Sequence, residues 1–143
     1  MRKETIVQLE CALDHLTGEE IGAAIKVLSE APFILDVIFL QGIGKKNRPC
    51  GLLQVLCLPG DENAAAIAIF KHTHTLGVRI QNIERLTLVR REAESSVAGE
   101  KVRAKEYDLE GRSYLRPESD EINRLAASHS LGAPAFRFGE QEK

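Results

Sequence analysis

The first 31 residues change from the period of a strand to the period of a helix. Apolar and polar positions alternate along residues 4–16, which predicts a strand with one buried face. The apolar face of this strand consists of Val7, Leu9, Cys11 and Leu13. Apolar positions then recur at helical spacing along residues 17–31, and Thr17 with Glu20 matches a capping box at the helix start. The chain therefore begins with a predicted β-α unit.

Two further apolar runs follow, one on each side of a basic loop. Residues 34–40 are apolar and rich in β-branched side chains, which predicts a central strand of a sheet. Residues 51–59 predict another strand, which Pro59 ends. Because a short loop joins the two runs, we expect them to form a hairpin.

The next segment combines an alanine-rich helix with a long strand. Asp61 is expected to cap a helix over residues 62–73, with Ile67 and Phe70 facing the core. Residues 76–92 predict a strand whose alternation slips in the middle, which indicates a bulge or a bend.

The resulting order β-α-β-β-α-β is typical of a ferredoxin-like α+β sandwich, in which both helices cover one face of an antiparallel sheet. The remaining residues predict an appended β-hairpin that turns at Gly99 and a C-terminal helix with Pro117 in its first turn. We expect residues 1–143 to form a single domain, with a core in 1–92 and an extension in 93–143.

Composition narrows the class of protein. The chain has 143 residues, 43% of them apolar, which is enough to bury a core, and its formal net charge of −2 argues against general binding to nucleic acid or acidic membranes. No apolar run approaches the roughly 18 residues of a membrane helix. Three cysteines without metal-ligand spacing suggest a reducing compartment. The expected protein is cytoplasmic and binds neither nucleic acid nor a membrane.

The basic loop at residues 42–51 is the first candidate site. Lys45, Lys46 and Arg48 provide the ammonium groups and the planar guanidinium that bind phosphate oxygens. The alternative is a solvated hairpin turn, since such turns are often rich in lysine and glycine. Composition alone favours the turn.

A second candidate lies around the start of the strand at 76–92. Thr75, Gly77 and Arg79 offer a hydroxyl, a flexible backbone and a guanidinium, and Arg90 with Arg91 adds positive charge further along. The alternative is a solvated strand face. A third candidate is a transition-metal site around the carboxylate and imidazoles of Asp14, His15, His72 and His74. Here the alternative is that the last two histidines lie at a fraying helix end.

Four segments together resemble the C-terminal domain of the nickel-insertion proteins of nickel-pincer cofactor biosynthesis, the family that makes the lactate racemase cofactor. The resemblance covers roughly residues 10–138. Its segments are "KKNRPCGLLQVLC" (45–57), "TLGVRI" (75–80), "LTLVRRE" (86–92) and "RPESDEINRLA" (116–126).

The resemblance implies a nickel insertase of the lyase class that uses CTP and a divalent metal, Mg or Mn. Nickel is then the substrate ion, inserted into a pyridinium bis-thiocarboxylate mononucleotide. It also implies a ferredoxin-like fold, trimer-based homo-oligomers, and a separate N-terminal partner chain for this short sequence. The implied nucleotide-binding and phosphate-binding residues are Lys45, Lys46, Arg48, Thr75, Gly77, Arg79, Arg90 and Arg91. The implied metal ligands are Asp14, His15 and His72.

The chain departs from the family pattern where that pattern has acids. Asp14 is kept, but Ala12 stands where the family has asparagine, and His15 and His72 stand where it has acids. Hard divalent cations prefer carboxylate oxygen, whereas histidine suits Ni²⁺. Two alternatives therefore stay open: a non-catalytic anion-binding or oligomerising paralogue, and a histidine-based metal storage or delivery domain.

Overall fold

The computed structural model describes residues 1–137 and divides the chain into two compact units. The first unit is Lys3–Leu86, and the second combines Met1–Arg2 with the chain from Thr87 onward. Within the described residues, no helix is long and apolar enough to span a membrane. The expectation that both parts form one domain stays a prediction.

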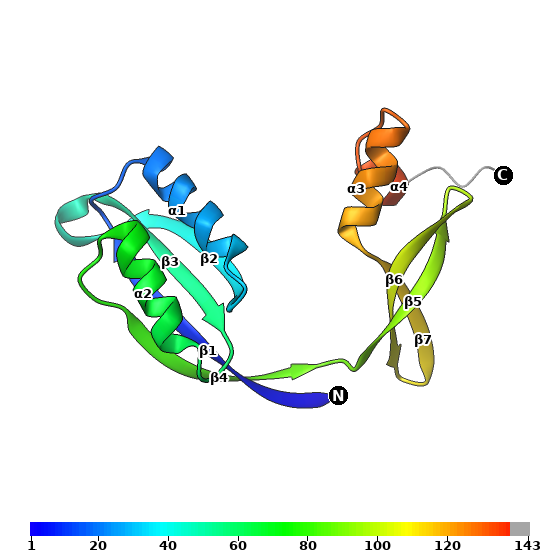
Figure 1. Ribbon diagram of the computed structural model, residues 1–143, viewed down its shortest axis with the longest axis horizontal. Coiled ribbons are helices and arrows are strands. Elements are labelled where there is room, and N and C mark those ends of the chain that lie inside the picture. Colours follow the sequence, from blue (N-terminus) through cyan, green and yellow to red (C-terminus); the bar gives the residue numbers. More distant parts are fainter. Residues whose placement is uncertain (138–143) are drawn as a thin grey trace. The chain divides into compact units, whose positions relative to one another are not determined.

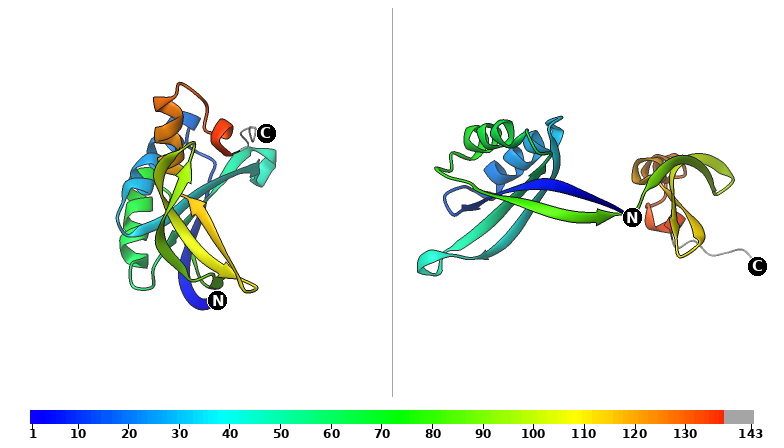
Figure 2. Two further views of the ribbon diagram at one scale, coloured as in Figure 1. Left: turned by 90° about the vertical axis from the view of Figure 1, so that its right-hand side faces the viewer. Right: turned by 90° about the horizontal axis from the view of Figure 1, so that it is seen from below.

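The first unit is a four-stranded sheet with two helices on one of its faces (Figures 1 and 2). The strand order is β2-β3-β1-β4, and β3 pairs antiparallel with both β1 and β2. A ferredoxin-like β-α-β-β-α-β chain has this order, so the predicted α+β class is confirmed. Its elements are β1 (Arg2–Leu13), α1 (Gly18–Glu30), β2 (Ile34–Ile43), β3 (Pro49–Cys57), α2 (Glu62–Thr73) and β4 (Arg79–Thr87).

The alternation along β1 produces the core of this unit, as predicted. The odd-numbered apolar residues Val7 to Leu13 are buried and pack with Leu53 and Val55 of β3 and with Leu28 of α1. The capping box is also confirmed, because the Thr17 hydroxyl accepts from the Glu20 N–H while the Glu20 carboxylate accepts from the Thr17 N–H.

The prediction of a central strand at 34–40 is wrong, because β2 lies at the edge of the sheet. Val37 and Phe39 pack against the core beneath the helices. Ile38 and Leu40 lie on the opposite face and are 42% and 50% exposed. The run is therefore apolar on both faces although only one face is covered.

Two predictions about α2 are also wrong. Ala65, Ile69 and Thr73 form its buried face, whereas Ile67 and Phe70 are exposed. Small residues allow the helix to lie close to the sheet, so the buried face is not the bulkiest one. Asp61 occupies the predicted N-cap position of α2, but its side chain makes no capping hydrogen bond.

The predicted long strand at 76–92 is two strands, because β4 ends at Thr87 and β5 begins at Arg90. The second unit continues with a three-stranded sheet of order β5-β6-β7. Its first turn, at Ala98 and Gly99, has positive φ at both residues and confirms the predicted hairpin. The elements are β5 (Arg90–Val97), β6 (Glu100–Leu109), β7 (Arg112–Pro117), α3 (Ser119–Ser128) and α4 (Pro134–Arg137).

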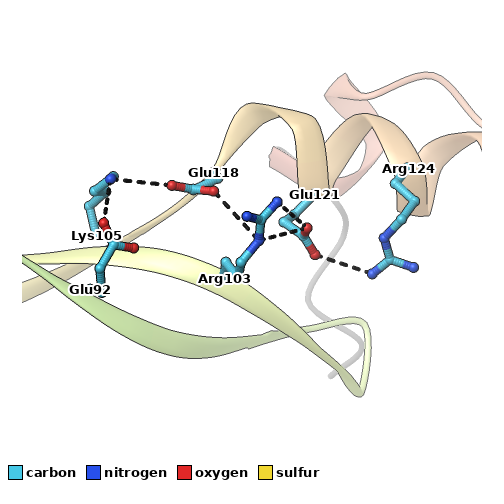
Figure 3. Close-up of polar contacts among 6 residues, drawn as sticks. All are labelled: Glu92, Arg103, Lys105, Glu118, Glu121 and Arg124. Carbon is cyan, nitrogen blue, oxygen red and sulfur yellow. Dashed lines mark hydrogen bonds and ion pairs between the residues drawn. The ribbon is translucent and has the colours of Figure 1, made fainter.

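The helix α3 packs on β6 and begins two residues later than predicted. Pro117 ends β7 instead of opening the helix, and Glu118 is the residue before the first turn. The predicted apolar stripe of Ile122, Leu125 and Ala126 is buried. Ion pairs join β6 to the start of α3: Arg103 binds Glu121 at 2.9 Å and Lys105 binds Glu118 at 3.4 Å (Figure 3).

Candidate functional site

The basic loop between β2 and β3 contains a short turn, Lys45–Asn47, in which both Lys46 and Asn47 have positive φ. The Gly44 N–H donates to the Arg48 carbonyl at 2.8 Å and closes the loop. Lys46 has left-handed backbone angles, with φ 60°. The side chains of Lys45 and Lys46 are exposed and form no ion pair within the described part of the chain. The loop therefore presents two ammonium groups to solvent.

Arg48 joins this loop to the loop between β1 and α1. Its guanidinium Nη2 lies 3.3 Å from Oδ2 of Asp14, and both side chains are about half exposed. The structure thus brings together a predicted phosphate-binding residue and a predicted metal ligand that are far apart in sequence. Exposed ion pairs contribute little stability, so a ligand can replace either partner at small cost.

His15 connects the same loop to the end of α2. Its Nε2 lies 2.8 Å from the Thr73 carbonyl oxygen. A carbonyl only accepts, so Nε2 carries the proton and neutral His15 keeps its lone pair on Nδ1. That Nδ1 lies 4.0 Å from Oδ1 of Asp14. Asp14 and His15 therefore offer two adjacent atoms that can ligate a metal ion.

The complete metal set of Asp14, His15 and His72 stays a prediction. Within the residues that the structure describes, no three His, Cys, Asp or Glu side chains form a group that could hold a metal ion. His72 is half-buried on α2, and no hydrogen bond or ion pair within the described residues joins it to Asp14 or His15.

A cleft of about 580 Å³ opens beside the basic loop. It lies between the first turn of α1, the β1–α1 loop and the adjoining ends of β2 and β3. Asp14 and Cys50 are its polar lining residues of most chemical interest. Ile43 and Pro49, which flank the basic loop, also line it.

An aromatic ring forms part of the cleft wall, above a glycine. The Phe39 ring lies across the Gly51 backbone so closely that a Cβ at Gly51 would lie 1.7 Å from Phe39 Cζ. Phe39 and Gly51 both line the cleft. The sequence indicated Gly51 as part of the basic loop but did not indicate Phe39, because their proximity depends on the β2–β3 register, which pairs Phe39 with Leu53 and Gln41 with Gly51.

The residues of the second candidate site have partners of their own. The Thr75 hydroxyl donates to the Gly77 carbonyl at 3.3 Å. Arg79 binds Glu10 at 2.8 Å, and Gln54 donates to the same carboxylate at 2.9 Å. The hydrogen bond from Gln54, and then that from Arg79, lowers the pKa of Glu10. Arg79 thus already pairs with a carboxylate of the neighbouring strand β1.

Arg90 and Arg91 belong to the second unit, on β5. Arg91 binds Glu106 at 3.2 Å and Asp108 at 3.0 Å, and the hydrogen bond to Glu106 is the larger cause of its raised pKa. Arg90 is exposed and forms no ion pair within residues 1–136. The two neighbouring arginines therefore differ in their freedom to bind an anion.

Comparisons with known proteins all indicate the same family. A protein-family model described as "Nickel insertion protein" matches residues 1–135. The pyridinium-3,5-bisthiocarboxylic acid mononucleotide nickel insertion protein of Alkaliphilus metalliredigens is 34% identical over 124 residues, which cover 87% of this chain and 29% of that protein. A relative from Maridesulfovibrio salexigens, also named for nickel insertion, is 36% identical over 124 residues, which cover 86% of this chain and 30% of that protein. The chain thus spans about a third of these relatives.

A solved structure is similar over nearly the full length of both chains. It is LarC2, the C-terminal domain of a cyclometallase involved in the synthesis of the NPN cofactor of lactate racemase, in its apo form. The TM-score is 0.84 at 26% identity, with 95% of this chain and 94% of that chain covered. The similarity therefore includes the appended three-stranded sheet as well as the first unit.

Proposed function

Because the chain belongs to the nickel insertion protein family, we propose that its first unit binds CTP with a divalent cation, Mg or Mn, during nickel insertion into the pincer cofactor. Nickel is the substrate ion in this proposal. Since the chain spans about a third of its curated relatives, we expect it to act together with the part that corresponds to their remaining length.

The observation that carries the proposal is the Arg48–Asp14 pair beside the cleft. A metal–nucleotide complex needs cations for its phosphates and oxygen ligands for its metal. Mg²⁺ in nucleotide sites is commonly held by one or two protein carboxylates, with phosphates and water completing its shell. Asp14 supplies one such carboxylate, and Lys45 and Lys46 are free to bind phosphate. The residues present therefore fit the complex.

The protein's own residues would act mainly by charge. Arg48 exchanges Asp14 for a phosphate, which leaves the Asp14 carboxylate for the cation. Lys45 and Lys46 then neutralise the other phosphate oxygens, and Phe39 offers a flat apolar surface to the base. The bound cation supplies further neutralisation of negative charge on the phosphates. Preorganised charges of this kind are the main contribution of proteins to phosphoryl and nucleotidyl transfer.

Titration calorimetry with Mg–CTP and Mn–CTP tests this proposal. The variants Lys46→Ala and Arg48→Ala should each weaken binding about ten- to a hundredfold, because a hydrogen bond to a charged group contributes about 1.5–3 kcal/mol. Lys26→Ala is the matched control, since Lys26 is an exposed lysine of α1 that does not line the cleft. Absence of binding heat, or equal affinity of all three variants, would refute the proposal.

A second candidate function is a non-catalytic module that binds the nucleotide without a metal or serves only to oligomerise. It is favoured by the absence of a three-ligand metal group among the described residues. Unchanged CTP affinity in EDTA would support the first form of this alternative. The proposed trimer-based homo-oligomer draws support from the exposed Ile38 and Leu40 of β2, and a monomer in light scattering would contradict it.

A further inference from the structure

The second unit carries an aromatic and cationic face that the first unit's site does not involve. Tyr107 of β6 and Tyr114 of β7 are register partners, and their rings stack with centroids 5.5 Å apart and planes 15° apart. Arg90 of β5 pairs with Tyr107 from the other side. Directly paired residues point to the same face of a sheet, so the three side chains form one row across the three strands.

Arg112 extends this row along β7. It lies two residues before Tyr114, and alternate residues of a strand share a face. Arg90, Arg112 and Tyr114 are exposed, and Tyr107 is half-buried. Neither Arg90 nor Arg112 has a hydrogen bond or ion pair to a side chain within the described residues. Two free guanidinium groups therefore flank a pair of stacked phenol rings.

The carboxylates on the same face are already neutralised. Glu92 and Glu118 both bind Lys105, at 2.6 and 3.4 Å (Figure 3). On the opposite face, Glu106 and Asp108 bind Arg91. The acids of this sheet thus have cationic partners of their own, and the charges of Arg90 and Arg112 remain uncompensated.

This arrangement matches the chemistry of a planar, positively charged ring that carries anionic groups. Tyrosine faces attract ligand cations through the ring quadrupole. Guanidinium groups bind phosphate and carboxylate in a bidentate manner. Isolated tyrosine pairs often serve only to stabilise a hairpin. Two exposed arginines without carboxylate partners beside the rings also provide the charge that a ligand's anionic groups require.

We propose that the row Arg90–Tyr107–Tyr114, with Arg112, is a binding site for a pyridinium mononucleotide. The ring stacks on the tyrosines, and the arginines hold its phosphate and ring carboxylate. The choice of a pyridinium ring rests on the proposed function in nickel-pincer cofactor synthesis. The site is separate from the one proposed for CTP, which lies in the first unit.

Intrinsic fluorescence provides a direct assay, because the chain has two tyrosines and no tryptophan. All of its tyrosine emission thus comes from Tyr107 and Tyr114. Nicotinic acid mononucleotide is the probe, since it combines a pyridinium ring, a carboxylate and a phosphate. We expect saturable quenching of the full chain, and Arg112→Gln should weaken it tenfold or more. CMP, which has a neutral ring, should bind at least tenfold more weakly.

The controls separate binding from other effects. Arg124→Gln is the matched variant, because Arg124 binds Glu121 on α3 and should leave the affinity unchanged. Free N-acetyltyrosinamide measures collisional quenching. Quenching of the protein that is linear and equal to that of the free amide would overturn the proposal, as would equal affinities of the two arginine variants. Tighter binding of an oligothymidylate than of the mononucleotide would also overturn it, in favour of a surface for single-stranded nucleic acid.

These experiments test the two proposed sites independently. Lys46→Ala should lose Mg–CTP binding and keep the tyrosine quenching, and Arg112→Gln should show the reverse. If the chain bound no CTP but its fluorescence were quenched as expected, the proposed function would fail and the mononucleotide site would stand.

Discussion

A methyl group at Gly51 should disrupt both the core and the cleft of the first unit. In Gly51→Ala the new Cβ would lie 1.7, 2.1 and 2.7 Å from three carbons of the Phe39 ring. Ordinary contacts between carbons are about 3.5–4.0 Å, so the ring must move by about 2 Å. Phe39 packs against the core and is half-buried. Its displacement should cost about 2–3 kcal/mol, which lies between an overpacking penalty and the loss of a whole phenylalanine side chain.

Urea unfolding followed by far-UV circular dichroism measures this cost. For a unit of this size, about 2 kcal/mol corresponds to a fall in Tm of roughly 8–16 °C. Gly42→Ala is the matched control, because nothing lies within 4 Å of a Cβ at Gly42. Replacing Phe39 by leucine should remove the clash, so Gly51→Ala combined with Phe39→Leu should be about as stable as Phe39→Leu alone. Equal stabilities of the Gly51 and Gly42 variants would show that the reasoning is wrong.

Two other predictions concern stability. The pKa of Glu10 is lowered in the folded protein. Ionised Glu10 should therefore stabilise the fold at pH values above its ordinary pKa of 4.5, and this stabilisation should be lost as the pH falls through the folded-state pKa. The difference in unfolding free energy between the natural chain and Glu10→Gln should therefore shrink on acidification, and a pH-independent difference in urea titrations would contradict this. Leu125→Ala should cost about 3 kcal/mol, since Leu125 is fully buried, whereas exposed Leu131→Ala should cost less than about 0.5. Urea unfolding followed by tyrosine fluorescence measures both costs, and equal costs for the two variants would contradict the assigned core.

The sequence predicted those features that depend on local patterns. From Val7 to Leu13 the apolar positions of β1 alternate with Gln8 and Glu10, a pattern that predicts a half-buried strand. The capping box of Thr17 and Glu20 lies within four residues, so its geometry follows from the backbone of the helix start alone. The hairpin at Gly99 follows likewise from the preference of glycine for positive φ. In each case the interacting groups are close in sequence.

The errors arose where two faces of an element are similarly apolar. Strand β2 carries apolar residues on both of its faces. Only its position in the sheet decides that Ile38 and Leu40 are exposed. In α2 the alanines separate bulky residues on several sides. Close contact with the sheet then selects the face of Ala65 and Ile69, because smaller side chains allow a shorter distance. Both outcomes depend on tertiary packing, which no local pattern contains.

The candidate site shows the same distinction in its charges. The sequence grouped its cations by motif, but the structure divides them by their partners. Lys45 and Lys46 have no ion pair in the described residues, and Arg48 shares Asp14 in a half-exposed pair that a phosphate can displace. Arg91, by contrast, binds two carboxylates on its own sheet, so a ligand must compete with both. An arginine in a family motif is thus available to a nucleotide only to the extent that the neighbouring strands leave it unpaired. By that criterion the basic loop of the first unit, and Arg90 and Arg112 of the second, are anion-binding candidates among the described residues.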